Sequence, residues 1–226
     1  MNSREKQNLK SWALDFGIHL SDHQINLLSI YLDELWDWNK KTNLTGLSSR
    51  RNIIRELMLD SLIPSAFLPT QGRFLDVGSG AGFPGIPLMI CNPALTAHFL
   101  EPNSKKTSFL KQVLRLTDLH QVVVFRGRIE KSKDLLHPQG YHAITARALA
   151  PLPKILKWCA PHLLPSGLII NFQGDQYSKA LEESSKVMKH HNLVLTRTIP
   201  YALPKKRLQR NILLLKKVTA PHTDAG

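Results

Sequence analysis

The segment RFLDVGSGAGFPGIP, residues 73–87, decides the fold of this chain. It opens with RFLDV, which is typical of a buried strand, and continues with the alternating glycines Gly78, Gly80 and Gly82. Glycine permits a sharp turn and lets the backbone approach a ligand closely. Pro84 then suits the first turn of a helix. Strand, glycine loop and helix in this order predict a ligand site at the carboxyl end of a strand in an α/β sheet.

Short apolar runs and helical patterns alternate through the rest of the chain. Such alternation builds a parallel sheet with helices on both faces. No helical pattern separates the last two apolar runs, so we expect them to pair as an antiparallel hairpin. The predicted fold is therefore α/β, with a mostly parallel seven-stranded sheet that ends in this hairpin. Strands are expected at 73–77, 95–101, 121–127, 142–146, 167–174, 193–201 and 210–218, and helices at 84–91, 104–117, 152–164 and 177–191.

The region before the sheet has helical patterns only. Ser21 and Gln24 have the spacing of a capping box, and apolar residues then recur every three or four positions. A further helix is predicted from Arg50 to Leu62, ending before Pro64. We therefore expect three parts, which are a helical extension over 1–70 that packs on the core, an α/β domain over 71–218 and a flexible tail over 219–226.

The composition indicates a globular protein with an anionic partner. Lys and Arg number 30 against 17 Asp and Glu, a net charge of +13. A surplus of this size favours a polyanion such as nucleic acid. No apolar run is long enough to cross a membrane, and no secretory signal follows the N-terminal charges. Cys91 and Cys159 lack the spacing of a metal site, so we expect a cytoplasmic protein without a metal.

The acid ahead of the glycine loop bears on the identity of the ligand. Gly80, Gly82 and Gly85 satisfy the G-x-G-x-x-G pattern of dinucleotide sites, so a nicotinamide or flavin enzyme remains an alternative. Asp76, however, would stand beside the pyrophosphate of a dinucleotide and repel it. S-adenosylmethionine has no phosphate, and a nearby carboxylate would attract its positively charged ammonium and sulfonium groups. The order of these residues therefore favours S-adenosylmethionine.

Other residues at strand ends complete a candidate cofactor site. Glu101 ends the second strand, where its two oxygens can accept from both hydroxyls of a ribose. Ile129 and Glu130 follow the third strand, where an adenine would lie. Arg147 follows the fourth strand, and we expect it to contact the cofactor or the target nucleotide.

Elimination reduces the number of chemical groups that could accept a methyl group from this protein. The segment after the fourth strand reads ITARALAPLP and lacks the Asn/Asp-Pro-Pro-aromatic box typical of amine methylation. Cys91 and Cys159 are better interpreted as packing residues than as nucleophiles. A ready lone pair such as guanine N7 remains, and it has no proton to lose. The sequence therefore assigns no catalytic acid or base, and catalysis is expected to rest on positioning.

Six motifs resemble, in order, those of one family: WNKKTNLTGL (38–47), LDSL (59–62), DVGSGAGFPGIPL (76–88), NSKKTSFL (103–110), GRIE (127–130) and ARAL (146–149). The family is the bacterial small-subunit rRNA guanine-N7 methyltransferases, also called the glucose-inhibited division protein B family. The resemblance implies a Rossmann-like class I methyltransferase fold and N7 methylation of a guanine in the decoding-region loop of 16S rRNA. Together with the strand-end argument, it places S-adenosylmethionine at Gly78, Gly80, Phe83, Glu101, Ile129, Glu130 and Arg147.

The chain also departs from the family pattern outside the cofactor loop. Glu56 and Leu57 stand where the family has Arg-His, Gln173 where it has lysine, and Asn211 where it has histidine. A non-catalytic or retargeted RNA-binding paralogue that keeps the cofactor site therefore stays an alternative. In either case the expected partner is 16S rRNA in the small subunit, and we expect a monomer.

Overall fold

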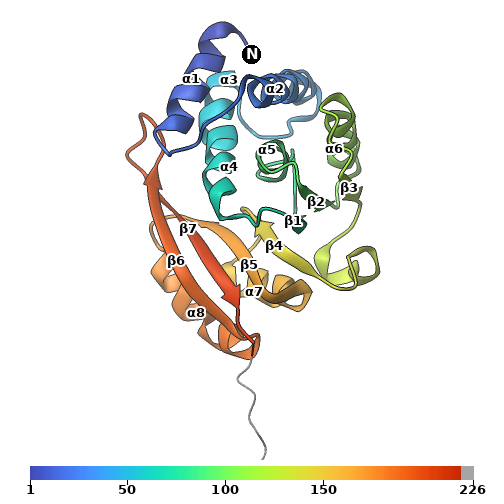
Figure 1. Ribbon diagram of the computed structural model, residues 1–226, viewed down its shortest axis with the longest axis vertical. Coiled ribbons are helices and arrows are strands. Elements are labelled where there is room, and N and C mark those ends of the chain that lie inside the picture. Colours follow the sequence, from blue (N-terminus) through green and yellow to red (C-terminus); the bar gives the residue numbers. More distant parts are fainter. Residues whose placement is uncertain (220–226) are drawn as a thin grey trace, which may run out of the picture.

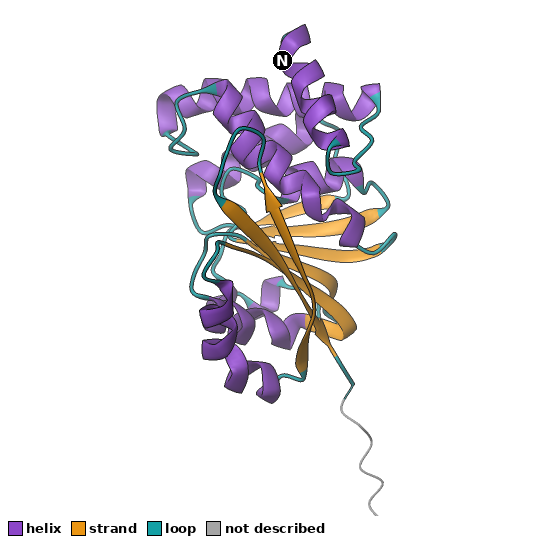
Figure 2. Ribbon diagram, turned by 90° about the vertical axis from the view of Figure 1, so that its left-hand side faces the viewer, coloured by secondary structure: helices purple, strands orange, loops and turns teal. Residues whose placement is uncertain are grey.

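A twisted sheet lies between two groups of helices in the computed structural model, which describes residues 1–219 (Figures 1 and 2). The order across its seven strands is β3-β2-β1-β4-β5-β7-β6. Strands β1 to β5 run parallel, and β7 pairs antiparallel with both β5 and β6. The predicted sheet and its terminal hairpin are confirmed. The strands are β1 Gly72–Val77, β2 Leu95–Leu100, β3 Val122–Phe125, β4 Tyr141–Ala146, β5 Leu163–Gln173, β6 Leu193–Ala202 and β7 Gln209–Lys217.

Strand order places a crevice beside β1. The chain moves from β1 outward through β2 and β3, then returns to the other side of β1 as β4. Connections on the two sides of such a switch point leave in opposite directions, which opens a crevice at the carboxyl ends of the strands. The glycine loop follows β1 and therefore lies at this crevice.

The helices form two groups, each over its own apolar core. One core joins the N-terminal helices, α5 and α6 to one face of the sheet, and the other core lies under α7 and α8. The first group contains α1 Ser3–Leu14, α2 Asp22–Thr42, α3 Arg50–Ile53, α4 Asp60–Leu62, α5 Gly85–Cys91 and α6 Ser104–Leu116, and the second contains α7 Leu152–Cys159 and α8 Tyr177–His190. Single 3₁₀ turns cover Ile129–Lys131, Lys133–Leu135 and Ala160–His162.

The capping box predicted for α2 is confirmed. The Gln24 backbone N–H donates to Ser21 Oγ at 3.2 Å, and the Ser21 N–H donates to Gln24 Oε1 at 2.9 Å. The helix ends at Asn43, which is left-handed with φ 43°. The capping box and the left-handed Asn43 thus define the two ends of α2.

One predicted helix end is confirmed and another is wrong. The helix predicted over 50–62 is present, with a π-helical stretch over Ile54–Leu59 between α3 and α4, and beyond Leu62 the chain continues as a 3₁₀ helix over Ile63–Phe67. Proline lacks an N–H, but the first turn of a new helical segment does not need one. Leu163 and Leu164, predicted as helical, belong to β5, because pairing with β4 overrides their helical periodicity.

The predicted domain boundaries at residues 70 and 218 stay predictions. Of the tail predicted over 219–226, all but Thr219 lies outside the described residues. Within residues 1–219, no helix has the length and apolar character needed to cross a membrane.

Candidate cofactor site

The glycine loop crosses the carboxyl end of β2. The N–H groups of Gly78 and Ser79 donate to the carbonyl oxygen of Leu100 at 2.8 and 3.2 Å. Gly78 has φ +71°, in the left-handed region, and a Cβ added to it would lie 2.8 Å from a methyl group of Leu149. Both observations explain why the loop requires glycine here.

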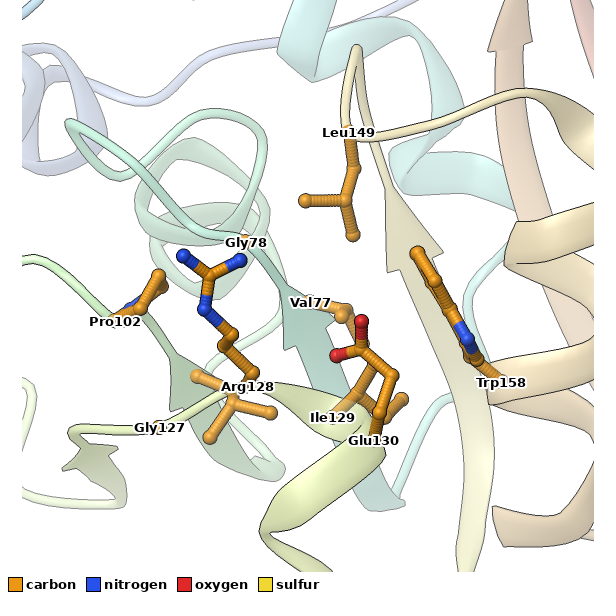
Figure 3. Close-up of a pocket in the computed structure, with 10 residues that line it drawn as sticks. Val77, Gly78, Pro102, Gly127, Arg128, Ile129, Glu130, Leu149 and Trp158 are labelled. Atoms are coloured by element: carbon orange, nitrogen blue, oxygen red, sulfur yellow. The ribbon is translucent and has the colours of Figure 1, made fainter.

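A cavity opens beside this loop, at the ends of the parallel strands (Figure 3). Three of the predicted cofactor residues line it, namely Gly78, Ile129 and Glu130. Leu149 and Trp158 close it from the side of β4 and α7, and sequence reasoning assigned neither to the site. Leu149 falls within the ARAL motif, but Trp158 carries no signal beyond its place in a helix. The complete lining is Val77, Gly78, Leu100, Pro102, Gly127, Arg128, Ile129, Glu130, Leu149 and Trp158.

Glu101 lies next to the cavity, between the lining residues Leu100 and Pro102, and only 5% of its surface is exposed. Its Oε2 accepts from the Gly80 N–H and its Oε1 from the Asn103 N–H, both at 2.8 Å. A carboxylate has about four acceptor positions, so each oxygen keeps capacity for a further donor. Glu101 therefore braces the glycine loop and remains able to accept from a vicinal diol.

Phe83 and Ala81 are held from the side of the N-terminal helices. The Phe83 ring is buried and lies 5.2 Å from the Tyr31 ring of α2. The Tyr31 hydroxyl donates to the Ala81 carbonyl at 2.6 Å. Phe83 thus contacts the core and is not among the residues that line the cavity. Tyr31, which the sequence reasoning missed, fixes the loop through a contact between residues 50 positions apart.

Asp76 lies inside the molecule, behind the loop. Its Oδ1 accepts from the Thr145 hydroxyl at 2.6 Å, and its Oδ2 is 2.7 Å from where a Cβ on Gly85 would be. Burial raises the pKa of Asp76 to about 6, although the hydrogen bond from Thr145 acts in the opposite direction. Its proposed attraction for a cationic ligand stays a prediction.

Arg147 is held by a buried carboxylate instead of facing this cavity. Its Nη2 lies 2.9 Å from Asp60 Oδ2, and its guanidinium stands over the Phe172 ring at 5.5 Å. Asp60 is 1% exposed and also accepts from Arg210 at 2.8 Å and from the Tyr201 hydroxyl at 2.7 Å. Arg147 Nη1 is buried without a hydrogen-bond partner among residues 1–219. A contact to cofactor or target through Arg147 stays a prediction.

The two cysteines occupy packing positions, as predicted. Cys159 is fully buried in α7, and Cys91 ends α5 against the first core. Burial raises the pKa of both thiols to about 12. In the described part of the chain, no group of three His, Cys, Asp or Glu side chains could hold a metal ion. The site therefore offers binding surfaces and no thiolate nucleophile.

A family model described as rRNA small subunit methyltransferase G matches residues 24–212. The chain belongs to this family. A relative with that name from Alkaliphilus oremlandii (strain OhILAs) is 35% identical over 218 residues, which cover 94% of this chain and 90% of the relative. A second, from Acetivibrio thermocellus, is 33% identical over 207 residues, covering 91% of this chain and 85% of the relative.

Solved structures confirm the Rossmann-like class I methyltransferase fold. M. jannaschii TYW2 in complex with AdoMet has a TM-score of 0.59 at 13% identity, over 71% of this chain and 75% of that one. Precorrin-6y C5,15-methyltransferase from Geobacter metallireducens GS-15 has a TM-score of 0.52 at 16% identity, over 78% and 92% of the two chains.

Membership in the methyltransferase G family makes this protein an S-adenosylmethionine-dependent methyltransferase, and it decides against the dinucleotide alternative. The residues present fit that cofactor. The loop at Gly78 has no side chain at the cavity wall, and Ile129 offers an apolar surface. Glu101 supplies a carboxylate beside them, with its orientation fixed by two backbone groups.

The family departures all have partners within this chain. Glu56 pairs with Arg55 at 2.8 Å and with Lys206 at 3.1 Å, while Leu57 packs against the first core. Gln173 Nε2 donates to Asn171 at 2.6 Å. Asn211 is 2% exposed, and its Nδ2 donates to the Gly174 carbonyl at 2.9 Å. These side chains therefore serve the fold around the crevice.

Because the pKa of Asp76 is raised, we expect the difference in stability between Asp76→Asn and the parent protein to depend on pH. Between pH 3.8, the ordinary pKa of an aspartate, and about pH 6, Asp76 is ionised in the unfolded chain but protonated in the folded protein. Rising pH therefore lowers the free energy of unfolding over this range. Asp76→Asn cannot ionise, and we expect its stability relative to the parent to rise across this range. The difference should reach about 3 kcal/mol, since one pKa unit corresponds to about 1.4 kcal/mol. Urea unfolding of the cofactor-free protein from pH 4.5 to 7.5 should show about 2 kcal/mol of this rise, because the remainder lies below pH 4.5.

The exposed Asp134→Asn is the matched control for this measurement, because it makes the same change at the surface. It should show no such trend. A difference between Asp76→Asn and the parent that stays constant from pH 4.5 to 7.5 would show that Asp76 has an ordinary pKa.

Proposed function

We propose that this protein transfers the methyl group of S-adenosylmethionine to N7 of a guanine in the decoding-region loop of 16S rRNA, on the small ribosomal subunit. The observation that carries the proposal is the match to the methyltransferase G family over residues 24–212. The cavity at the ends of the parallel strands supplies a place for the cofactor. The net charge of +13 suits an RNA substrate.

The proposed residues act by binding and alignment. S-adenosylmethionine supplies an activated methyl group on a sulfonium. Glu101, fixed by the N–H groups of Gly80 and Asn103, accepts from the ribose hydroxyls. Ile129 and Leu149 form apolar walls that exclude water from the cavity. Gly78 lets the backbone approach the bound group closely.

The target atom explains the lack of a catalytic acid or base. Guanine N7 carries a lone pair and no proton, so no base has to remove one before the attack. The rate enhancement then comes from holding nucleophile and methyl group in line and from excluding water. Both thiols of the chain have pKa values raised to about 12 by burial, which fits a mechanism without a covalent enzyme intermediate.

A ribosomal substrate implies a cytoplasmic site of action, and we propose a monomer as the acting form.

Asp60 and its three partners Arg147, Tyr201 and Arg210, called the Asp60 cluster below, lie where the helical segment 50–62 meets the end of β4 and the strands β6 and β7. Arg147 follows β4 directly, so the cluster adjoins the crevice. We propose that Arg147 orders the cofactor or the target nucleotide there.

Transfer of a tritiated methyl group tests the proposed activity. Small subunits that lack their native methylation and naked 16S rRNA are incubated with the protein and tritiated S-adenosylmethionine. We expect label in the rRNA of the subunits, and we expect Glu101→Ala to lose most of it. The exposed Asp134→Asn should label as the parent does.

A protein that binds S-adenosylhomocysteine but labels no RNA would contradict the proposal and support a non-catalytic RNA-binding paralogue. The departures at Leu57, Gln173 and Asn211 favour that second candidate. Label outside the decoding region would instead indicate a retargeted enzyme.

A further inference from the structure

A second cavity lies between α1, the start of the segment 50–62 and the loop that joins β6 to β7. Figure 1 shows this loop beside α1. None of its lining residues lines the cofactor cavity. The lining is Asn2, Arg4, Glu5, Asn8, Trp12, Arg51, Ile54 and Lys205.

The charge of this second cavity is strongly positive. Arg4, Arg51 and Lys205 are exposed, and none of them takes part in an ion pair or side-chain hydrogen bond within residues 1–219. Glu5 is the only acid of the lining, and Arg50 neutralises it through contacts at 2.9 and 3.2 Å. The hydrogen bond from Arg50 lowers the pKa of Glu5, so this acid stays charged and paired. Three cations are left to meet an anion.

The wall of the cavity adds an aromatic surface to these cations. Trp12 is half-buried and packs against the first core, which limits its motion. Asn8, in the same wall, has an amide that can donate and accept. An aromatic ring beside clustered cations is the combination that binds single-stranded nucleic acid, where a base stacks on the ring and the cations meet phosphates.

The β6–β7 loop lies at the carboxyl edge of the parallel strands, which is the edge that carries the cofactor cavity. Lys205 lines the cavity, Lys206 pairs with Glu56 at 3.1 Å, and Arg210 pairs with Asp60 at 2.8 Å. The loop and the start of β7 thus follow the helical segment from Arg51 to Asp60. Single-stranded RNA bound at the crevice can therefore extend along this loop.

We propose that the second cavity is an accessory RNA-binding site that takes one nucleotide of single-stranded rRNA. The base lies against Trp12, and the flanking phosphates contact Arg4, Arg51 and Lys205. The proposal rests on the proposed function for the identity of the RNA. It assigns to the N-terminal helices a contact with substrate that is separate from methyl transfer.

A triple variant, Arg4→Gln, Arg51→Gln and Lys205→Gln, tests the site. All three side chains are exposed, so the fold should persist. We expect the KM for small subunits to rise at least tenfold while kcat and S-adenosylhomocysteine affinity stay unchanged. The slope of log affinity against log salt for a single-stranded rRNA oligonucleotide should become shallower by about 2, because each phosphate that a cation neutralises adds about 0.7 to the slope.

The matched control removes the same charge from the opposite face. Lys179→Gln, Lys186→Gln and Lys189→Gln change three exposed lysines of α8. In this control, KM should stay within about twofold of the parent and the salt slope within about 0.5, since no phosphate is neutralised there. Trp12→Ala should weaken oligonucleotide binding about tenfold, and Trp12→Phe should restore most of it because the ring face remains.

The outcomes separate this proposal from the proposed function. A parent protein that binds the oligonucleotide through these residues yet labels no rRNA would overturn the methyltransferase activity and support the accessory site. A triple variant that behaves like the α8 control would overturn the accessory site. Weaker binding to subunits with unchanged binding to the oligonucleotide would also overturn it, since these cations would then bind ribosomal protein.

Discussion

Glu101→Ala is expected to weaken S-adenosylhomocysteine binding by about 10- to 100-fold. The variant removes a carboxylate whose hydrogen bonds each contribute about 1.5–3 kcal/mol as bonds to a charged group. It also leaves the N–H groups of Gly80 and Asn103 without their acceptor, so the glycine loop loses its brace. Isothermal titration calorimetry of parent and variant measures the change.

Two further variants separate ligand contact from support of the loop. Glu101→Gln keeps one acceptor oxygen and should lose less affinity than Glu101→Ala. Glu182→Ala removes an exposed carboxylate of α8 and should bind as the parent does. If folded Glu101→Ala binds S-adenosylhomocysteine within twofold of the parent's affinity, Glu101 does not contribute to cofactor binding.

Asp60→Ala is expected to destabilise the protein by about 3–5 kcal/mol, because removing one partner of a buried pair leaves uncompensated charge. Asp60 is 1% exposed and carries the contacts of Arg147, Arg210 and Tyr201. Breaking a surface pair costs far less, since water and salt screen the exposed charges. The free energy of unfolding in urea at pH 7 measures the loss.

The surface carboxylate Asp33 is the natural comparison. It also binds an arginine, Arg50, at 2.6 Å, but 52% of its side chain is exposed. Asp33→Ala should therefore cost no more than about 1 kcal/mol. Equal losses for Asp33→Ala and Asp60→Ala would mean that the Asp60 cluster does not hold the helical segment 50–62 to the sheet.

Local patterns predicted the parts of the site that local sequence determines. The glycine loop, the strand before it and the helix after it occupy adjacent residues, so their spacing fixes their geometry. Glu101, Ile129 and Glu130 were predicted because each follows a strand, and parallel strands end at the same edge.

Contacts between distant segments could not be predicted in this way. Tyr31 reaches Ala81 from a separate helix, and Asp60 meets Arg147 from 87 positions earlier. No periodicity signals such a pair, because it depends on how the N-terminal helices settle on the sheet. The 3₁₀ helix after Leu62 was not predicted either, since a proline allows a new 3₁₀ turn where it forbids a continued α-helix.

The N-terminal helices, which the sequence predicts to pack on the core, divide two tasks between them. Helix α2 packs on the core and holds the glycine loop through Tyr31. Helix α1 contributes the cation Arg4 and the aromatic ring of Trp12 to the lining of the second cavity. The extension therefore supports the cofactor loop with one helix and, in our proposal, contacts RNA with another.

Identifying the nucleoside formed in 16S rRNA decides whether this protein methylates guanine N7. Small subunits lacking native methylation are treated with the protein and S-adenosylmethionine, and their rRNA is digested to nucleosides and analysed by mass spectrometry. We predict about one equivalent of 7-methylguanosine per subunit, and most of it should be lost with Glu101→Ala. A methyl group on carbon or on an exocyclic amine, or no methylated nucleoside at all, would contradict the account.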